Sequence, residues 1–378
     1  MDIKDEALKR HKRLRGKIEL KLKDKLDTKT KLSLYYTPGV GAVSAYVTKH
    51  PQQARDYTWL NNTVAVISDG SAVLGLGNIG PLGALPVMEG KAMLFKQFAK
   101  IDGVPIVLDV HQPDEIVAAV EAIAPSFGAI NLEDIAAPQC FEIEDRLKAK
   151  LDIPVMHDDQ HGTAVVVLAG LINALAITNK KLSDCRIVIV GAGAAGTAIA
   201  KLLLKYAKPE IIVVDSRGII SRGRKDLSAE KQDLAKLTNP ADLNGSLKKA
   251  VAGADIFIGV SAPGLLSGQM VRSMSPKPII FAMANPVPEI MPGEARAAGA
   301  AVIATGRSDF PNQVNNALAF PGIFRGALDN KVSQITDEHK IAAAEAIAAL
   351  IKKPAPDNII PSLFDRRLVP AIARLIVP

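Results

Sequence analysis

Nine short runs of apolar, largely β-branched residues recur along the chain, each followed by a polar loop and a stretch of helical composition. The runs cover residues 63–68, 104–110, 128–132, 153–156, 186–190, 210–215, 255–260, 278–283 and 301–305. Near-continuous apolar strands that alternate with helices are typical of parallel sheets covered on both faces. With 378 residues to divide, the pattern predicts an α/β protein of two domains with mainly parallel sheets.

Polar side chains close or follow most of these predicted strands. They are Asp69, Asp109, Glu133, Asp134, Asp158, Asp159, Asp215, Ser261 and Asn285. In open parallel sheets, ligands bind at the carboxyl ends of the strands. A single polar residue there means little, because loops are polar in general, but the repetition favours an enzyme.

The segment RIVIVGAGAAGTAIAKLLLKYAKPEIIVVD, residues 186–215, predicts a dinucleotide-binding unit of strand, helix and strand. Gly191 permits a tight turn, Gly193 lets a pyrophosphate approach the backbone, and Gly196 lets the helix pack closely on the strand. Asp215 ends the second strand 24 residues after Gly191. The candidate cofactor-binding residues are Gly191, Ala192, Gly193, Ala194, Ala195, Gly196 and Asp215.

Gly75, Gly77 and Gly80 repeat the same glycine spacing. We expect no second dinucleotide site there, because Pro81 and Pro86 should interrupt the helix that such a site needs. No acidic residue ends a following strand at the required distance either.

Glu133, Asp134 and Asp159 follow neighbouring predicted strands, so three carboxylates could converge at one edge of a sheet. Unpaired, they would repel one another, and a hard divalent cation would remove that cost. Oxygen ligands alone favour Mg²⁺ or Mn²⁺. The alternative is that Asp158 and Asp159 only cap a helix that begins near Thr163.

Zinc is not favoured, because no further His or Cys extends a ligand pattern from His157 and His161. Cys140 and Cys185 are too few for a disulfide framework, so we interpret them as buried thiols.

The net charge of +7 arises mainly from the first 31 residues, with twelve Lys or Arg against six Asp or Glu. Interleaved acids and the lack of aromatic residues favour a solvated helix face or a subunit contact over nucleic-acid binding. Attraction of acidic metabolites stays open. The charged N-terminus and the short apolar run 164–177 predict a cytoplasmic protein that binds no membrane.

Several motifs, in order from about residue 33 to the end, together carry a family resemblance. They are SLYYTPGVG, SDGSAVLGLGNIG, PVMEGKAMLFKQFAKIDGVPIVLD, INLEDI, HDDQHGTA, VIVGAGAAGTAIA, FAMANPVPEI and NNALAFPGIFRGAL. The chain resembles malic enzyme in its short prokaryotic form. The resemblance implies oxidative decarboxylation of malate to pyruvate and CO₂, with a nicotinamide cofactor and a divalent metal.

By this resemblance, Glu133, Asp134 and Asp159 match the metal ligands, Tyr36 the general acid and Lys91 the general base. A lysine acts as a base when burial or a nearby cation lowers its pKa towards neutrality, and we expect this of Lys91.

Four further positions bear on the site. We expect Asp158 to orient Lys91 or a water. Asn285, Asn315 and Asn316 match positions that contact substrate or nicotinamide. Ala72 stands where larger malic enzymes carry an arginine that grips the substrate carboxylate, so the means of holding that carboxylate is open.

The sequence signals disagree about the cofactor. Asp215 should face the adenosine ribose and favour NAD, whereas Arg217, Arg222 and Arg224 could grip a 2′-phosphate. We expect those arginines to stay solvated, and hence NAD⁺ to be preferred with NADP⁺ tolerated.

We expect residues 1–160 to form a catalytic and metal-binding domain and residues 161–378 the NAD(P)-binding domain, with C-terminal helices packing back on the first. We also expect a homodimer. Two alternatives stay open: oxaloacetate decarboxylation or a malolactic conversion on the same scaffold, and a non-catalytic nucleotide sensor.

Overall fold

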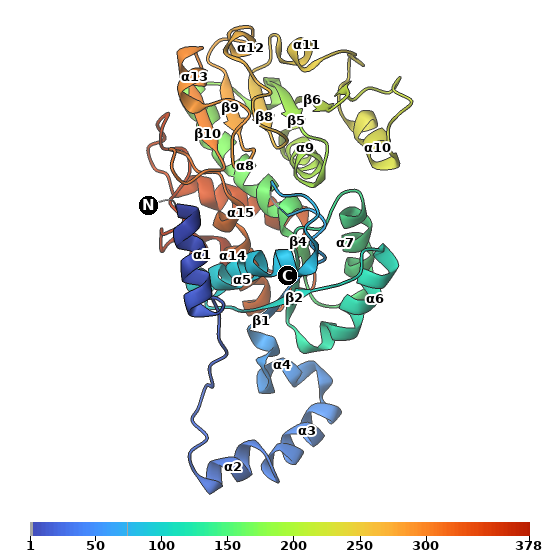
Figure 1. Ribbon diagram of the computed structural model, residues 1–378, viewed down its shortest axis with the longest axis vertical. Helices are drawn as coiled ribbons and strands as arrows, with labels where there is room; N and C mark the ends of the chain where they lie inside the picture. Colours follow the sequence, from blue (N-terminus) through green and yellow to red (C-terminus); the bar gives the residue numbers. More distant parts are fainter. Residues whose placement is uncertain (1–2, 74) are drawn as a thin grey trace.

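A computed structural model describes residues 3–73 and 75–378, and it contains two β-sheets one above the other (Figure 1). The first sheet has the strand order β2-β1-β3-β4. Its strands are β1 (Thr63–Ser68), β2 (Asp102–Val107), β3 (Ala129–Leu132) and β4 (Val155–His157). All of its strand pairs are parallel.

The second sheet has the order β10-β9-β8-β5-β6-β7. Its strands are β5 (Arg186–Val190), β6 (Glu210–Asp215), β7 (Gly218–Ile219), β8 (Ile256–Gly259), β9 (Ile279–Ala282) and β10 (Val302–Thr305). The pairs are parallel except for β6 with β7. The α/β class, the nine predicted strands and their parallel pairing are therefore confirmed, and only the two-residue strand β7 was not predicted.

Many of the helices lie between these strands in the chain and pack around the sheets. They are α1 (Ile3–Leu14), α2 (Lys29–Tyr35), α3 (Gly39–Lys49), α4 (Ala54–Tyr57), α5 (Gly80–Ala99), α6 (Pro113–Ile123), α7 (Gln139–Lys150), α8 (Asp158–Thr178), α9 (Ala194–Ala207), α10 (Ala229–Leu237), α11 (Leu247–Val251), α12 (Gly268–Arg272), α13 (Pro292–Ala297), α14 (Phe320–Asp329), α15 (Asp337–Ala349) and α16 (Leu368–Ala373).

Helix α8 connects the two sheets and forms the centre of the largest hydrophobic core, which contains residues of both sheets. By length and composition its 21 residues could cross a membrane, contrary to the expectation from the shorter run 164–177. Most of the helix is buried inside the protein, so it is a core helix and not a membrane span.

Helix α5 is continuous although it contains Pro81 and Pro86, so the expectation that these prolines interrupt it is wrong. Pro81 lies in the first turn, where the backbone N–H groups have no partner within the helix. The carbonyl that loses a partner to Pro86 belongs to Leu82, which is exposed and open to water.

Helix α14, near the C-terminus, packs against α5, which itself packs on the first sheet. The ring centroid of Phe95 lies 4.7 Å from that of Phe320 and 5.3 Å from that of Phe324, both in edge-to-face geometry. The C-terminal segment therefore packs on the same helix that carries Lys91.

Helices α2 and α3 project from the body at the end opposite the second sheet (Figure 1). Neither helix has a buried residue, although they expose apolar side chains such as Leu34, Val43 and Tyr46. We refer to this segment, residues 29–49, as the arm.

Candidate active site

Three carboxylates meet at the carboxyl ends of β3 and β4, which are neighbours in the first sheet. Glu133 and Asp134 follow β3, and Asp159 lies in the first turn of α8. One oxygen from each lies within 4.8 Å of the others, and the backbone N–H of Asp134 donates to Oδ2 of Asp159 at 2.9 Å. The predicted convergence of these residues is thus present in the fold.

Helix α8 begins at Asp158, five residues before the start expected near Thr163. Asp158 and Asp159 are therefore first-turn residues, where the helix dipole stabilises carboxylates, while the N-cap is His157. Both side chains also make contacts outside the helix. Asp159 accepts a hydrogen bond from the backbone N–H of Asp134, and Asp158 forms an ion pair with Lys91. Capping alone does not account for the two aspartates.

Lys91 projects from α5 into this carboxylate group and is buried. Its Nζ lies 2.9 Å from Oε1 of Glu133, forms an ion pair with Asp158, and sits 4.5 Å from the ring centroid of Phe320. The predicted contact between Asp158 and Lys91 is present. Helix α5, the loop after β3 and the start of α8 thus bring a lysine and four carboxylates together.

The electrostatics of Lys91 differ from the expectation. Burial opposes its charge, but Asp158, Glu133 and Asp159 outweigh burial and raise the pKa of Lys91 above its ordinary value. The expected lowering towards neutrality is therefore wrong for this arrangement, because sequence spacing did not show how many carboxylates would face the amine.

The same crowding acts on the acids. Burial, reinforced by Asp159 and other neighbouring carboxylates, raises the pKa of Glu133 well above its ordinary value, although Lys91 opposes the shift. Burial likewise raises the pKa of Asp158. A divalent cation among Glu133, Asp134 and Asp159 would relieve this repulsion, and a purely oxygen donor set suits Mg²⁺ or Mn²⁺. The residues present fit such an ion.

His157 and His161 take no part in that ligand set, since the group with metal-ligand geometry among the described residues is Glu133, Asp134 and Asp159. Instead, Nε2 of His161 lies 2.8 Å from Oε2 of Glu144, a buried residue of α7. Burial lowers the pKa of His161 to about 4.

A cleft of about 510 Å³ adjoins the carboxylates and joins both halves of the chain. Its lining includes Ala72, Gly75, Asp159, Thr163, Gly193, Ala194, Ala195, Ser261, Asn285, Asn315 and Asn316. The three predicted asparagines thus come together beside the glycine loop and a candidate metal ligand. No lysine or arginine is among its described lining residues, so the structure offers no direct replacement for an arginine at Ala72.

The glycine loop has the features of a dinucleotide site. Gly191 has a φ of +113°, and a Cβ on Gly196 would lie 1.8 Å from the Gly191 carbonyl oxygen, so both positions require glycine. A Cβ on Gly193 would meet open space at the N-terminus of α9, where a phosphate could approach. Ala192 completes the loop between β5 and α9, so the described residues fit a nicotinamide dinucleotide.

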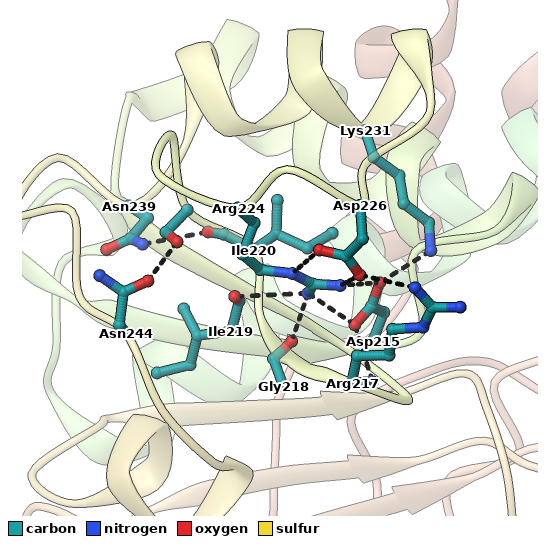
Figure 2. Close-up of polar contacts among 11 residues, drawn as sticks. Asp215, Arg217, Gly218, Ile219, Ile220, Arg224, Asp226, Lys231, Asn239 and Asn244 are labelled. Atoms are coloured by element: carbon teal, nitrogen blue, oxygen red, sulfur yellow. Dashed lines mark hydrogen bonds and ion pairs between the residues drawn. The ribbon is translucent and has the colours of Figure 1, made fainter.

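A second cavity, of about 840 Å³, lies at the ends of β5 and β6 and shares Ser261 with the cleft. Figure 2 shows the charged cluster on its wall. Arg224 donates to Asp215 from Nη1 at 2.8 Å, and Lys231 of α10 donates to Asp215 at 2.8 Å. Burial opposes these contacts, but Arg224 and Lys231 outweigh it and lower the pKa of Asp215 to about 2.

The expectation that the arginines stay solvated is wrong for Arg224, whose side chain is only 14% exposed. It is correct for Arg217 and Arg222, which are mostly exposed even though each has a carboxylate partner. Sequence reasoning missed Asp226 and Lys231 in this cluster. The available signal was that Asp215 and Asp226 flank the basic residues of this loop, because opposite charges close together in a loop can neutralise one another.

Tyr36 is the one predicted catalytic residue that the fold leaves apart from the others. It follows α2 in the arm, is 65% exposed, and is not among the described residues that line the cleft. Cys140 and Cys185 are free and buried, as expected, and burial raises their pKa values to about 12 and about 11.

Two family models and several known proteins match most of the chain. The malic enzyme N-terminal domain matches residues 15–148, and the malic enzyme NAD-binding domain matches residues 160–374. A bifunctional malic/malolactic enzyme of Bacillus subtilis is 54% identical over 100% of this chain and 92% of its own length. An NAD-dependent malic enzyme of Geobacillus stearothermophilus is 55% identical over 96% of this chain and 76% of its own length.

The crystal structure of an NAD-dependent malic enzyme from Thermotoga maritima superimposes with a TM-score of 0.95 at 50% identity, covering 98% of both chains. Agreement of sequence and fold at this level extends through both sheets and the site between them. On these grounds, the chain belongs to the malic enzyme family.

Proposed function

We propose that this protein catalyses the oxidative decarboxylation of L-malate to pyruvate and CO₂ with reduction of a nicotinamide dinucleotide. The observation that carries the proposal is a cluster in which Lys91 pairs with Glu133, and Glu133 lies beside Asp134 and Asp159. Asp159 lines the same cleft as the glycine loop. Family membership supports the same reaction.

The carboxylates Glu133, Asp134 and Asp159 would hold Mg²⁺ or Mn²⁺. When bound, that ion would supply Lewis acidity at the C2 oxygen of the substrate and offset the charges of Glu133 and Asp159, which raise the pKa of Lys91. The dinucleotide, held by the glycine loop, would supply the hydride acceptor.

Two residues of the chain would move protons. Lys91, in its uncharged form, would accept the proton of the C2 hydroxyl as hydride leaves C2, while Asp158 keeps its amine in position. Loss of CO₂ from C4 leaves an enolate, and Tyr36 would protonate it at C3. Asn285, Asn315 and Asn316 would hold the substrate carboxylates and the carboxamide of the nicotinamide, since their side-chain amides lie in the lining of the cleft.

We further propose that NAD⁺ is preferred and NADP⁺ tolerated. Asp215 already accepts from Arg224, Lys231 and the backbone N–H of Arg217. A ribose hydroxyl can reach it most easily by displacing Lys231, which is partly exposed and contributes one bond. The displaced ammonium would then stand close enough to the ribose to tolerate a 2′-phosphate.

Tyr36 would act from a second subunit. The arm has no buried residue of its own and exposes Leu34, Val43 and Tyr46, so an apolar partner surface would stabilise it. We propose a homodimer in which each arm packs on the partner and brings Tyr36 to the partner's cleft. Two-fold symmetry then completes both sites with one interface.

A mixed dimer tests this arrangement. Combining Tyr36→Phe with Lys91→Ala subunits regenerates one intact site when Tyr36 acts across the interface, and none when it acts within its own chain. Activity well above that of either homodimer supports the proposal, and the absence of any gain contradicts it.

We also propose that residues 1–160 and 161–378 act as the metal-binding and cofactor-binding domains of a cytoplasmic enzyme. Helix α8 begins at this boundary, with Asp159 facing the cleft, and most of its length contributes to the shared core. Separate expression of either part should therefore expose the apolar face of α8 or of its partners.

A malolactic conversion is a second candidate, because the Bacillus subtilis relative is named a bifunctional malic/malolactic enzyme. Assays of the purified protein with L-malate, Mn²⁺ and NAD⁺ separate the two. Equal amounts of reduced cofactor and pyruvate support the proposed function. Lactate without net reduction of the cofactor would support the second candidate instead.

A further inference from the structure

Arg224 uses all of its hydrogen-bonding capacity within the protein. Its Nε and Nη2 donate to the two oxygens of Asp226 at 3.0 and 2.7 Å. Its Nη1 and Nη2 donate to Asp215, and Nη1 also lies 3.3 Å from the carbonyl oxygen of Gly218. A guanidinium has five N–H donors, so none is left for a ligand in this arrangement (Figure 2).

Asp226 also accepts from Arg217, whose Nη1 lies 3.0 Å from Oδ2. One carboxylate therefore binds both guanidinium groups on the wall of the 840 Å³ cavity. Asp226 is not among the described residues that line the 510 Å³ cleft, and its own side chain is one-third exposed. Its contacts are confined to the charged cluster at the adenosine end of the cofactor site.

The positive and negative charges of this cluster nearly cancel. Arg217, Arg224 and Lys231 exceed Asp215 and Asp226 by one positive charge. Removal of the Asp226 charge would double that excess and release three guanidinium N–H groups beside the end of β6. Guanidinium groups bind phosphate in bidentate geometry, so these released donors would favour a 2′-phosphate.

We propose that Asp226 is a specificity-determining residue that limits use of the 2′-phosphorylated dinucleotide by holding Arg217 and Arg224. The proposal rests on the proposed binding of a nicotinamide dinucleotide at the glycine loop. In this proposal, Asp215 discriminates between the two cofactors by contacting the ribose. Asp226 acts indirectly, because its pairing with Arg217 and Arg224 keeps these guanidinium groups from binding a 2′-phosphate.

Equilibrium binding to the full-length protein tests the proposal without relying on turnover. Calorimetric titration with adenosine 2′,5′-bisphosphate and with 5′-AMP measures the 2′-phosphate contribution separately. In Asp226→Asn, the bisphosphate should bind at least about tenfold more tightly, as expected for newly available charged hydrogen bonds. The affinity for 5′-AMP should change by less than about threefold, because this ligand has no 2′-phosphate for the released guanidinium groups to bind.

Three further variants make the result specific. Asp233→Asn, on α10, removes the same charge from an exposed pair with Lys236 and should leave both affinities unchanged. Adding Arg217→Ala and Arg224→Ala together to Asp226→Asn should cancel the gain. Asp226→Ala repeats the test with a smaller side chain, and thermal unfolding checks that each variant is folded.

The proposal is overturned by unchanged bisphosphate affinity in both Asp226 variants, or by an equal gain in Asp233→Asn. Failure of the proposed function is distinguishable from these results. A protein that binds both adenosine ligands but does not oxidise malate would contradict the reaction and leave the role of Asp226 intact. A protein that binds neither ligand would contradict both.

Discussion

The backbone N–H of Asp134 lies 2.9 Å from Oδ2 of Asp159, and this hydrogen bond joins the end of β3 to the first turn of α8. It holds two candidate metal ligands from different elements at one point. The convergence of Glu133 with this pair gives a donor set for a hard divalent cation.

We therefore predict that activity requires Mg²⁺ or Mn²⁺ and is lost in Asp159→Ala. The metal should also stabilise the fold, by about 2.7 kcal/mol when its concentration is a hundred times Kd. Steady-state assays with and without chelator, and thermal unfolding with added Mn²⁺, measure the two effects. Asp152→Ala, an exposed acid outside the site, should behave like the wild type. Full turnover in metal-free buffer would contradict the assignment.

Lys91 and Tyr36 should support different steps. Tyr36→Phe should slow pyruvate formation from malate but retain more of the capacity to reduce a 2-keto acid, which needs no enolate protonation. Lys91→Ala should impair both, because the C2 oxygen exchanges a proton in each reaction. Comparing kcat for the two reactions in each variant measures how far the two residues support different steps. An equal loss of both activities in Tyr36→Phe would argue against it.

Asp215→Ala should shift the ratio of kcat/KM towards NADP⁺ by at least about tenfold, or roughly 1.4 kcal/mol. The substitution removes the carboxylate that we expect to face the ribose, and it also releases Lys231 and part of Arg224. Steady-state kinetics with both cofactors provide the measurement. A wild-type preference for NADP⁺ that Arg217→Ala abolishes would show that the arginines, and not Asp215, discriminate.

The buried carboxylate of Glu144 should contribute to stability in a pH-dependent way. Burial opposes its charge, but His161 and Lys148 outweigh burial and hold its pKa below the ordinary value of 4.5. A depressed pKa stabilises the fold above the unfolded value, and this contribution is lost as the pH falls below about 4.5.

Glu144→Gln should therefore destabilise the protein at pH 7 by about 3 kcal/mol, as for a buried ion pair that loses one partner. The deficit should shrink as the pH falls below the ordinary carboxyl pKa. Denaturant unfolding across this range measures it, with Glu142→Gln as a control on the exposed face of the same helix. A deficit that grows on acidification would refute the role of this charge.

Much of the fold could be predicted because strands buried on both faces have a near-continuous apolar sequence. The run 63–68 coincides with β1, and the run 210–215 coincides with β6. Helix starts were harder to predict. The early start of α8 at Asp158 depends on the stabilisation of carboxylates in its first turn, which apolar periodicity does not report.

The site was predictable where strand order alone brings residues together, as for Glu133 and Asp159. It was not predictable where the position of a residue depends on pairing between side chains. The burial of Arg224 depends on its pairing with Asp226, two residues away along a loop, and with Asp215 at the end of β6. The position of Tyr36 depends on what the arm contacts, and the sequence of one chain does not specify that surface.

The central claim is that hydride from C2 of malate passes to the dinucleotide and that pyruvate is released. The most direct measurement follows L-malate deuterated at C2, with Mn²⁺ and NAD⁺, by mass spectrometry of cofactor and products. The account predicts one deuterium in each reduced cofactor and an equal amount of unlabelled pyruvate. Deuterium recovered in lactate, with no net reduced cofactor, would contradict it.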